Sequence, residues 1–174
     1  MTKNKKKTKK KARKKKVKVG IIGTGGIAGA HARSFHQIPE AKIVGLCDII
    51  PGKAEKYKKK QDFPEAKTFE NHQEMLSQLE LDAVSVCTYN TTHAEVAIDS
   101  LNAGLDVICE KPMSVTLEEA VNMARAAEKN DKILTIGFQP RYDPNMQEIK
   151  RLVQSGILGD VYYVETGGGR RRGI

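Results

Sequence analysis

A glycine-rich turn, Gly23-Thr24-Gly25-Gly26-Ile27-Ala28, constrains the fold of this chain more than any other stretch. It follows the apolar run 17–22 and opens a run of small residues that extends to Ala32, so the pattern predicts a strand, a tight turn and a helix. Gly23 permits the turn, Gly25 lets the backbone approach a pyrophosphate, and Ala28 lets the helix pack closely on the strand. Glycine turns of this kind also occur for steric reasons alone, and the context decides between the two interpretations.

An acidic residue supplies that context. Asp48 ends a second apolar run, 43–47, and stands 25 positions after Gly23 (48 − 23 = 25), close to the spacing of an acceptor for a ribose 2′-hydroxyl. The predicted dinucleotide-binding residues are therefore Gly23, Thr24, Gly25, Gly26, Ile27, Ala28 and Asp48. NAD is expected over NADP, because Asp48 repels a 2′-phosphate and the neighbouring Ile49 and Ile50 supply no cation; Lys53 is the residue that qualifies this expectation.

Strands and helices alternate along the chain, which predicts an α/β fold with a Rossmann-type, doubly wound parallel sheet. The strands are expected over 17–22, 41–48, part of 63–69, 81–87, 105–109 and 132–136, and the helices over about 26–37, 53–60, 72–79, from Thr91 or Thr92 to 102, and 116–130. Thr116 and Glu119 form a capping box, and Gly104 is expected to end a helix.

The pattern changes after residue 140. A helix over 142–155 and a strand over 160–166 are expected to begin a second, truncated α+β domain. The predicted organisation is a disordered basic tail over 1–16, a dinucleotide-binding domain over 17–140, and a linking helix with the start of the second domain over 141–174.

The formal charge of +9 belongs to the tail. Residues 1–16 carry ten lysines and Arg13, or +11, so the remainder carries 9 − 11 = −2. A tail of this composition is expected to make at most non-specific contacts with polyanions, although a nuclear address or a nucleic-acid arm stays open. Glycines interrupt the apolar stretch that follows, which argues against a secretory signal, and no segment reaches the length of a membrane span.

Three cysteines, Cys47, Cys87 and Cys109, each end an apolar, strand-like run. An odd number in such positions indicates buried thiols in a reducing compartment, and the cytoplasm is expected. The pattern indicates neither a disulfide framework nor a metal site.

Five motifs in order and spacing resemble the Gfo/Idh/MocA oxidoreductases over about residues 17–174. They are the glycine turn, Cys87-Thr88-Tyr89-Asn90-Thr91-Thr92-His93, Glu110-Lys111-Pro112, Gly137-Phe138-Gln139-Pro140-Arg141-Tyr142 and Gly156-Ile157-Leu158-Gly159. The resemblance implies an NAD(P)-dependent oxidoreductase that acts on sugars, polyols or related compounds.

The resemblance also implies site residues. Lys111 lies beside the nicotinamide in such enzymes and hydrogen-bonds the reacting hydroxyl or carbonyl, and the bond between Lys111 and Pro112 is expected to be cis. The further cofactor contacts implied are Thr88, Asn90, His93, Glu110, Lys111 and Gln139. For two of these residues an alternative to cofactor contact stays open. Glu110 orients Lys111 instead, and His93 stands at the start of a helix without binding a ligand. Arg170 to Arg172 either reach a substrate or form a solvated cluster.

Family members continue into a second domain that completes the substrate pocket, so this chain is expected to bind dinucleotide without turnover, and to self-associate or be marginally stable. The alternative belongs to a different functional class: a catalytically inactive dinucleotide-binding or interaction module with a polybasic tail. Continuation of the reading frame past Ile174 distinguishes the two.

Overall fold

The computed structural model describes residues 16–167, in two compact units that divide between Gly137 and Phe138. The expectations for the basic tail before Lys16 and for Arg170 to Arg172 concern residues outside this range. Each unit is described by itself.

The first unit is a six-stranded parallel sheet with the strand order β3-β2-β1-β4-β5-β6. Its strands are β1 (Val17–Ile22), β2 (Ala41–Cys47), β3 (Lys67–Phe69), β4 (Ala83–Val86), β5 (Asp106–Cys109) and β6 (Leu134–Ile136). Its helices are α1 (Ala28–His36), α2 (Lys53–Gln61), α3 (His72–Gln78), the 3₁₀-helix η1 (Asn90–Thr92), α4 (His93–Asn102) and α5 (Leu117–Lys129). The predicted α/β class and doubly wound sheet are confirmed.

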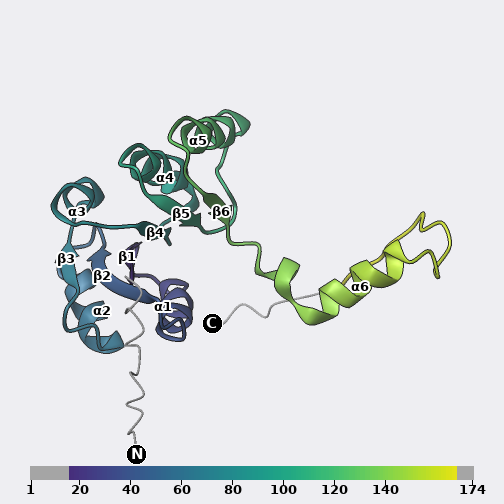
Figure 1. The fold of residues 1–174 in the computed structure, drawn as a ribbon, viewed down its shortest axis with the longest axis horizontal. Helices are drawn as coiled ribbons and strands as arrows, with labels where there is room; N and C mark the ends of the chain where they lie inside the picture. Colours follow the sequence, from purple (N-terminus) through teal and green to yellow (C-terminus); the bar gives the residue numbers. More distant parts are fainter. Residues whose placement is uncertain (1–15, 168–174) are drawn as a thin grey trace, which may run out of the picture. The chain divides into compact units, whose positions relative to one another are not determined.

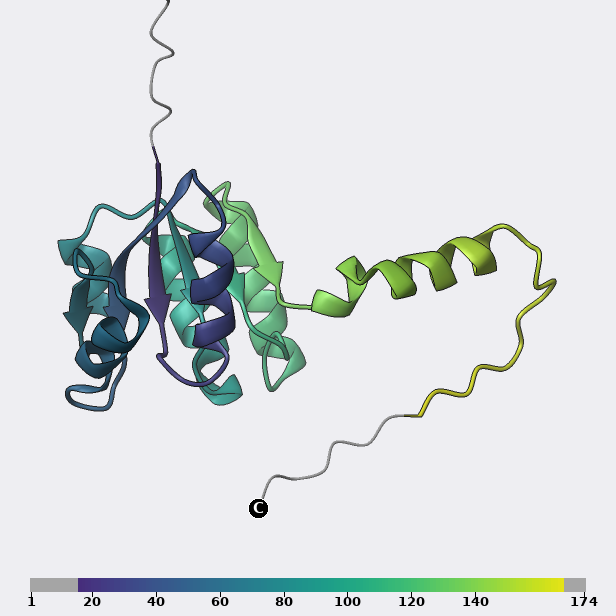
Figure 2. The same cartoon turned by 90° about the horizontal axis from the view of Figure 1, so that it is seen from below.

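Helices cover both faces of this sheet. Figure 1 shows α3, α4 and α5 on one side of the strands, and α1 and α2 on the other. Adjacent strand residues point to opposite faces, so Ile21 and Leu46 pack with α1 and α2, whereas Ile22 and Cys47 pack with the other layer. Ile21 and Ile22 of β1 and Ala28 of α1 belong to these buried clusters, and the turn between β1 and α1 lies at the end of β1 (Figure 2).

The predicted helix ends are correct in two cases out of three. The Thr116 side chain accepts a hydrogen bond from the Glu119 N–H, and the Glu119 carboxylate accepts one from the Thr116 N–H, which is the expected capping box. Gly104 has a φ of +82° after the end of α4. Thr92 stands at the start of α4 but makes no side-chain cap, because its hydroxyl donates to the Tyr89 carbonyl instead.

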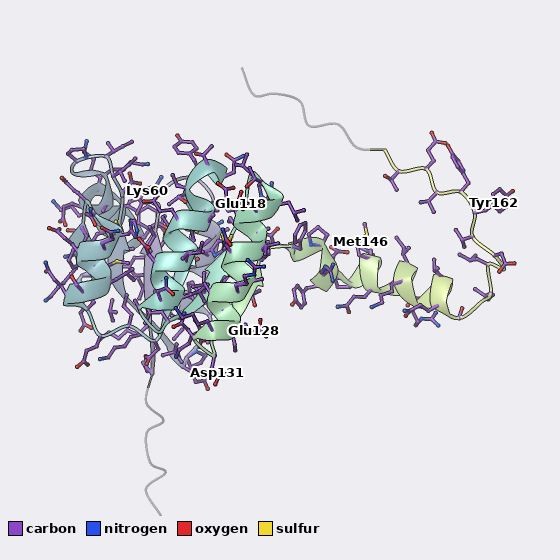
Figure 3. All side chains as sticks on the ribbon, turned by 90° about the horizontal axis from the view of Figure 1, so that it is seen from above. Lys60, Glu118, Glu128, Asp131, Met146 and Tyr162 are labelled. Carbon is purple, nitrogen blue, oxygen red and sulfur yellow. The ribbon has the colours of Figure 1, made fainter. Side chains whose placement is uncertain are left out.

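The second unit contains the 3₁₀-helix η2 (Gln139–Tyr142) and α6 (Pro144–Gln154). The Asp143 carboxylate caps α6 by accepting hydrogen bonds from the N–H groups of Asn145 and Met146. None of the α6 residues is buried, and Figure 3 shows the Met146 side chain near the start of this helix and Tyr162 on the segment that follows it.

The prediction of a strand over 160–166 is wrong. Residues 161–167 adopt no regular secondary structure. Alternating side chains make a segment compatible with a strand, but a strand forms only against a partner that completes its hydrogen-bond ladder, and no described segment pairs with this one. Over residues 16–167, no helix is both long and apolar enough to cross a bilayer.

Candidate functional site

The turn after β1 requires a glycine at its first position. Gly23 has a φ of +89°, and a Cβ at this position would lie 2.6 Å from the carbonyl carbon and oxygen of Cys87. Its N–H donates to the Cys47 carbonyl at 2.8 Å, so the turn is fixed against the ends of β2 and β4. Since the strand order reverses between β1 and β4, this turn lies at the topological switch point, where ligands of doubly wound sheets bind.

The next two glycines face open space. A Cβ at Gly25 or Gly26 would meet no atom within 4 Å. Packing therefore does not demand glycine at these two positions. The space in front of them is the space that a ligand in close contact with the backbone would fill.

A cleft of about 410 Å³ extends from these glycines. Six of the predicted residues line it, namely Gly23, Gly25, Gly26, Ile27, Asp48 and Thr88, together with residues that sequence reasoning did not assign to the site, such as Ile22, Lys53, His72, Tyr89 and Glu95. Six other predicted residues do not line this cleft, namely Thr24, Ala28, Asn90, His93, Glu110 and Lys111. Ala28 is fully buried beneath the turn, in the role predicted for it, since it packs in the cluster that includes Ile21.

Asp48 is only 5% exposed and is held by hydrogen bonds from both neighbouring loops. Its Oδ2 accepts from the N–H of Thr24 at 2.9 Å, from the Thr24 hydroxyl at 2.8 Å and from Lys53 Nζ at 2.8 Å. Its Oδ1 accepts from the Ile50 N–H at 3.1 Å. Burial raises the pKa of this carboxyl, but the hydrogen bonds from Lys53, Thr24 and Ile50 outweigh burial and lower the pKa below its ordinary value.

The residue that was expected to qualify the preference for NAD, Lys53, lies against Asp48. Ile49 and Ile50 are exposed and uncharged, as expected, but Lys53 places a cation directly against Asp48. The loop Pro51-Gly52, with a φ of +71° at Gly52, turns the start of α2 back toward the end of β2, which brings Lys53 to Asp48 across five residues of sequence.

A buried polar chain lies behind the residues that follow β5. Glu110 is 4% exposed, and its Oε1 lies 2.8 Å from His31 Nε2, while its Oε2 accepts from the Lys111 N–H at 3.2 Å. His31 Nδ1 lies 2.8 Å from the Ser85 hydroxyl. Glu110 thus contacts Lys111 through the backbone, which favours the alternative in which Glu110 orients Lys111.

Sequence reasoning did not identify His31 as part of this chain. The signal was present, because His31 stands three residues after Ala28 and one before Ala32 on the helix face that packs on the sheet. A titratable side chain on a face of small buried residues requires a polar partner, and Ser85 and Glu110 provide two.

Lys111 follows β5 and is exposed to solvent. The Lys111–Pro112 peptide bond is cis, as predicted. His93 is 1% exposed, with Nδ1 at 2.7 Å from the Pro112 carbonyl oxygen and Nε2 at 3.2 Å from that of Thr88. The ring therefore ties the loop after β4 to the loop after β5, and this position favours a helix-start residue without a ligand contact.

The remaining predicted residues lie at two different places. Asn90 begins η1 and is exposed, whereas Gln139 begins η2 and belongs to the second unit. Among residues 16–167, the structure shows no group of three or more His, Cys, Asp or Glu side chains able to hold a metal ion.

Comparison with known proteins agrees with this geometry. A model of the Gfo/Idh/MocA oxidoreductase family, described as having an NAD-binding Rossmann fold, matches residues 17–138. Inositol 2-dehydrogenase of Salmonella typhimurium is 33% identical over 145 residues, which are 82% of this chain and 43% of that enzyme. This chain therefore spans less than half the length of that relative.

Two solved structures are similar in fold. Scyllo-inositol dehydrogenase of Lactobacillus casei, with bound NAD(H) and scyllo-inositol, has a TM-score of 0.76 and 27% identity over 84% of this chain and 43% of its own. The WlbA dehydrogenase of Bordetella pertussis, in complex with NADH and UDP-GlcNAcA, has a TM-score of 0.80 and 28% identity over 85% of this chain and 45% of its own. With its matching fold, its glycine turn and the family model over residues 17–138, this chain belongs to the Gfo/Idh/MocA family of NAD-binding oxidoreductases.

Proposed function

We propose that this chain binds NAD in the cleft at the switch point and forms the cofactor-binding part of a dehydrogenase for a sugar or polyol. The observation that carries the proposal is the joint position of Gly25, Gly26 and Asp48 on the walls of one cleft. Two of these residues leave space for a pyrophosphate against the backbone, and the third offers a fixed carboxylate for a ribose.

The start of α1 suits the phosphates. The first N–H groups of a helix have no partner within the helix, and their dipoles favour an anion. Ile27 precedes α1 and lines the cleft, so the N–H groups of Gly26 and Ile27 are proposed to hold the pyrophosphate. Thr88, which lines the cleft beyond β4, is proposed to contact the nicotinamide end.

NAD is the proposed cofactor because Asp48 accepts from a 2′-hydroxyl and repels a 2′-phosphate. When bound, NAD supplies the site that accepts or gives the hydride. The proposed role of Lys111 is to hydrogen-bond the substrate oxygen, where its ammonium stabilises the negative charge that develops during transfer. The substrates of the relatives, inositol and a UDP-linked sugar among them, support a polyol or sugar for this chain.

Turnover by the 174-residue chain alone is not expected. Hydride transfer needs a substrate carbon held roughly 3–3.5 Å from the nicotinamide. Lys111 is exposed and outside the described cleft, so this unit offers no enclosing wall around its ammonium. An assay of NADH production with inositols and glucosides should therefore give no turnover, and robust turnover would refute this part of the proposal.

We propose two further features. The three buried, unpaired thiols are consistent with a reducing compartment such as the cytoplasm. The exposed apolar side chains of α6, Met146, Ile149 and Val153, favour self-association, which sedimentation velocity over a range of concentrations would detect.

Binding is tested with NADH, whose own fluorescence changes on binding. The informative variant is Gly25→Ala, because the added Cβ meets no protein atom but occupies the space proposed for the pyrophosphate. We expect Gly25→Ala to keep the thermal stability of the parent and to weaken NADH binding about tenfold or more.

Gly29→Ala is the matched control. It adds the same methyl group at the second residue of α1, where its nearest neighbours are side-chain atoms of Arg33 at 3.5 Å and Gln61 at 3.8 Å. We expect it to bind NADH like the parent chain. Equal binding by the parent, Gly25→Ala and Gly29→Ala would place the dinucleotide elsewhere, and no binding by the folded parent would refute the proposed function.

A further inference from the structure

A second cavity lies at the opposite ends of the strands from the cleft. The cleft borders the turn at the end of β1, whereas this cavity borders Lys16, which precedes β1, and Ala41, which begins β2 (Figure 2). Its volume is about 290 Å³, and the described residues that line it share no member with those that line the cleft. The proposed function therefore leaves this cavity unused.

Rings and apolar side chains form most of the walls of the second cavity. These residues are Phe35, Ile38, Pro39, Ala41, Ile43, Phe63 and Pro64. The exposed ring of His36, which also lines the cavity, stacks on the ring of Phe63, with the centroids 4.9 Å apart and the planes at 21°. Because Phe63 is buried, it supports the imidazole as a flat surface on which another planar ring can stack. A volume near the lower bound for ligand pockets, roughly 300 Å³, suits a single ring system.

The charged side chains at this cavity balance one another. The lining holds two lysines, Lys16 and Lys42, and two carboxylates, Asp62 and Glu65. The hydrogen bond from Lys42 and the charges of Lys42 and Lys16 lower the pKa of the Glu65 carboxyl, which is therefore ionised at neutral pH. An ionised carboxylate accepts a hydrogen bond from the exocyclic amino group of a base. The lining thus suits an uncharged ring with amino donors more than a phosphate.

The phosphates of such a ligand have a separate partner in the same chain. Residues 1–16 carry eleven cationic side chains, and Lys16, the last of them, also lines the cavity. This basic segment supplies the positive charge that the balanced lining lacks. It contains no aromatic side chain, so it offers a base no aromatic ring for stacking. The segment and the cavity therefore complement each other, since one attracts phosphates and the other accepts a planar base.

We propose that the second cavity binds an unpaired base of a single-stranded nucleic acid whose phosphates contact the basic segment 1–16. A single strand is favoured over a duplex because a base enters such a cavity only when it is unpaired and unstacked. The basic segment attracts any polyanion, whereas the cavity adds a preference for strands that carry bases. This site is separate from the cleft proposed for NAD.

The test compares two fluorescently labelled strands of about 12 nucleotides, a length within the usual site sizes. One strand carries adenine and cytosine, and the other is abasic with the same number of phosphates. Anisotropy titrations of both with the full chain, with and without saturating NADH, measure the ratio of the two affinities. We expect the strand with bases to bind about fivefold or more tightly, from the stacking of one base. Added salt should weaken binding of both strands alike.

His36→Ala removes the exposed ring of the stack. The ratio of the two affinities should fall about threefold or more in this variant, while the affinity for the abasic strand should change less than about twofold. His36→Phe keeps a ring and should keep the ratio within about twofold of the parent value. Gln37→Ala is the matched control, because Gln37 is the next residue, is exposed and does not line the cavity. Circular dichroism establishes that each variant is folded.

Several results would overturn the proposal. Equal affinity of the parent chain for the two strands would mean that the basic segment binds any polyanion. An equal ratio in His36→Ala and Gln37→Ala, or a preference that disappears with NADH, would place the base outside the second cavity. Absence of binding of both strands by the folded parent would also overturn the proposal. All these results leave the proposed binding of NAD standing, because the fluorescence of NADH measures that binding independently.

Discussion

Gly23 and Gly25 are two residues apart, and a side chain would have opposite effects at the two positions. At Gly23 an added Cβ collides with the backbone of Cys87, whereas at Gly25 it meets empty space. The first glycine is therefore required by the fold, and the second is available to a ligand. A glycine motif in a sequence does not make this distinction, because both roles need only the absence of a side chain.

Gly23→Ala should destabilise the chain. The substitution forces a left-handed φ on alanine and a contact of 2.6 Å with backbone atoms that cannot move aside. We expect the free energy of unfolding to fall by about 3 kcal/mol or more, measured by urea denaturation. A loss below about 1 kcal/mol would show that the turn tolerates a side chain.

Tyr57→Phe should leave the stability unchanged or raise it. The Tyr57 hydroxyl is buried and finds no hydrogen-bond partner among the described residues. Burial raises the pKa of this side chain to about 12, in keeping with a hydroxyl removed from water. Removing it should change the free energy of unfolding by about 0 to +1 kcal/mol, and a clear loss of stability would indicate a partner for the hydroxyl.

Single residues of the site were predictable to different degrees. Asp48 followed from its spacing to the glycine turn, because both stand at the ends of neighbouring strands. The Lys53 contact and the chain of His31, Ser85 and Glu110 depend on which loops the fold brings together, so they required the structure.

The helices and strands of the first unit were largely predictable, because each carries its own signal. The apolar runs define buried strands, and the capping box at Thr116 defines the start of α5 within a residue. The sequence of the segment over 160–166 is not sufficient by itself to define a strand. Its alternation suits a strand, but pairing depends on a partner elsewhere in space.

The contribution of the capping box to the stability of α5 can be tested by substitution. Thr116→Ala removes the side-chain acceptor of the Glu119 N–H at the start of α5 and should lower the free energy of unfolding by about 1 kcal/mol. Thr91→Ala is the control, since Thr91 is exposed within η1 and caps no α-helix. Equal losses in the two variants, by urea denaturation, would show that the capping box contributes nothing measurable.

In the first unit, the accessibility of three cysteines to solvent shows whether the ends of the strands stay closed. Cys47, Cys87 and Cys109 lie at or just after the ends of β2, β4 and β5, and all are buried. Burial raises the thiol pKa to about 12 for Cys47, about 11 for Cys87 and about 12 for Cys109. Since folding raises these pKa values, their contribution to stability is present below about pH 9 and is lost as the pH rises through the folded values.

The native chain should therefore resist alkylation at about pH 8. Iodoacetamide, followed by intact mass spectrometry, should leave the native chain unmodified over a time in which the chain in concentrated urea takes up three labels. Rapid labelling of the native chain would show that at least one of these strand ends opens to solvent.

The cleft formed by the glycine turn and Asp48 is proposed to hold the dinucleotide, and two-dimensional amide NMR with NAD tests this proposal most directly. We predict that the amide signals of Gly25, Gly26 and Ile27, together with those next to Asp48, shift with one common saturation curve. Amides on the far ends of the strands, such as that of Lys42, should not shift. Shifts confined to other parts of the chain, or none at saturating NAD, would contradict the account.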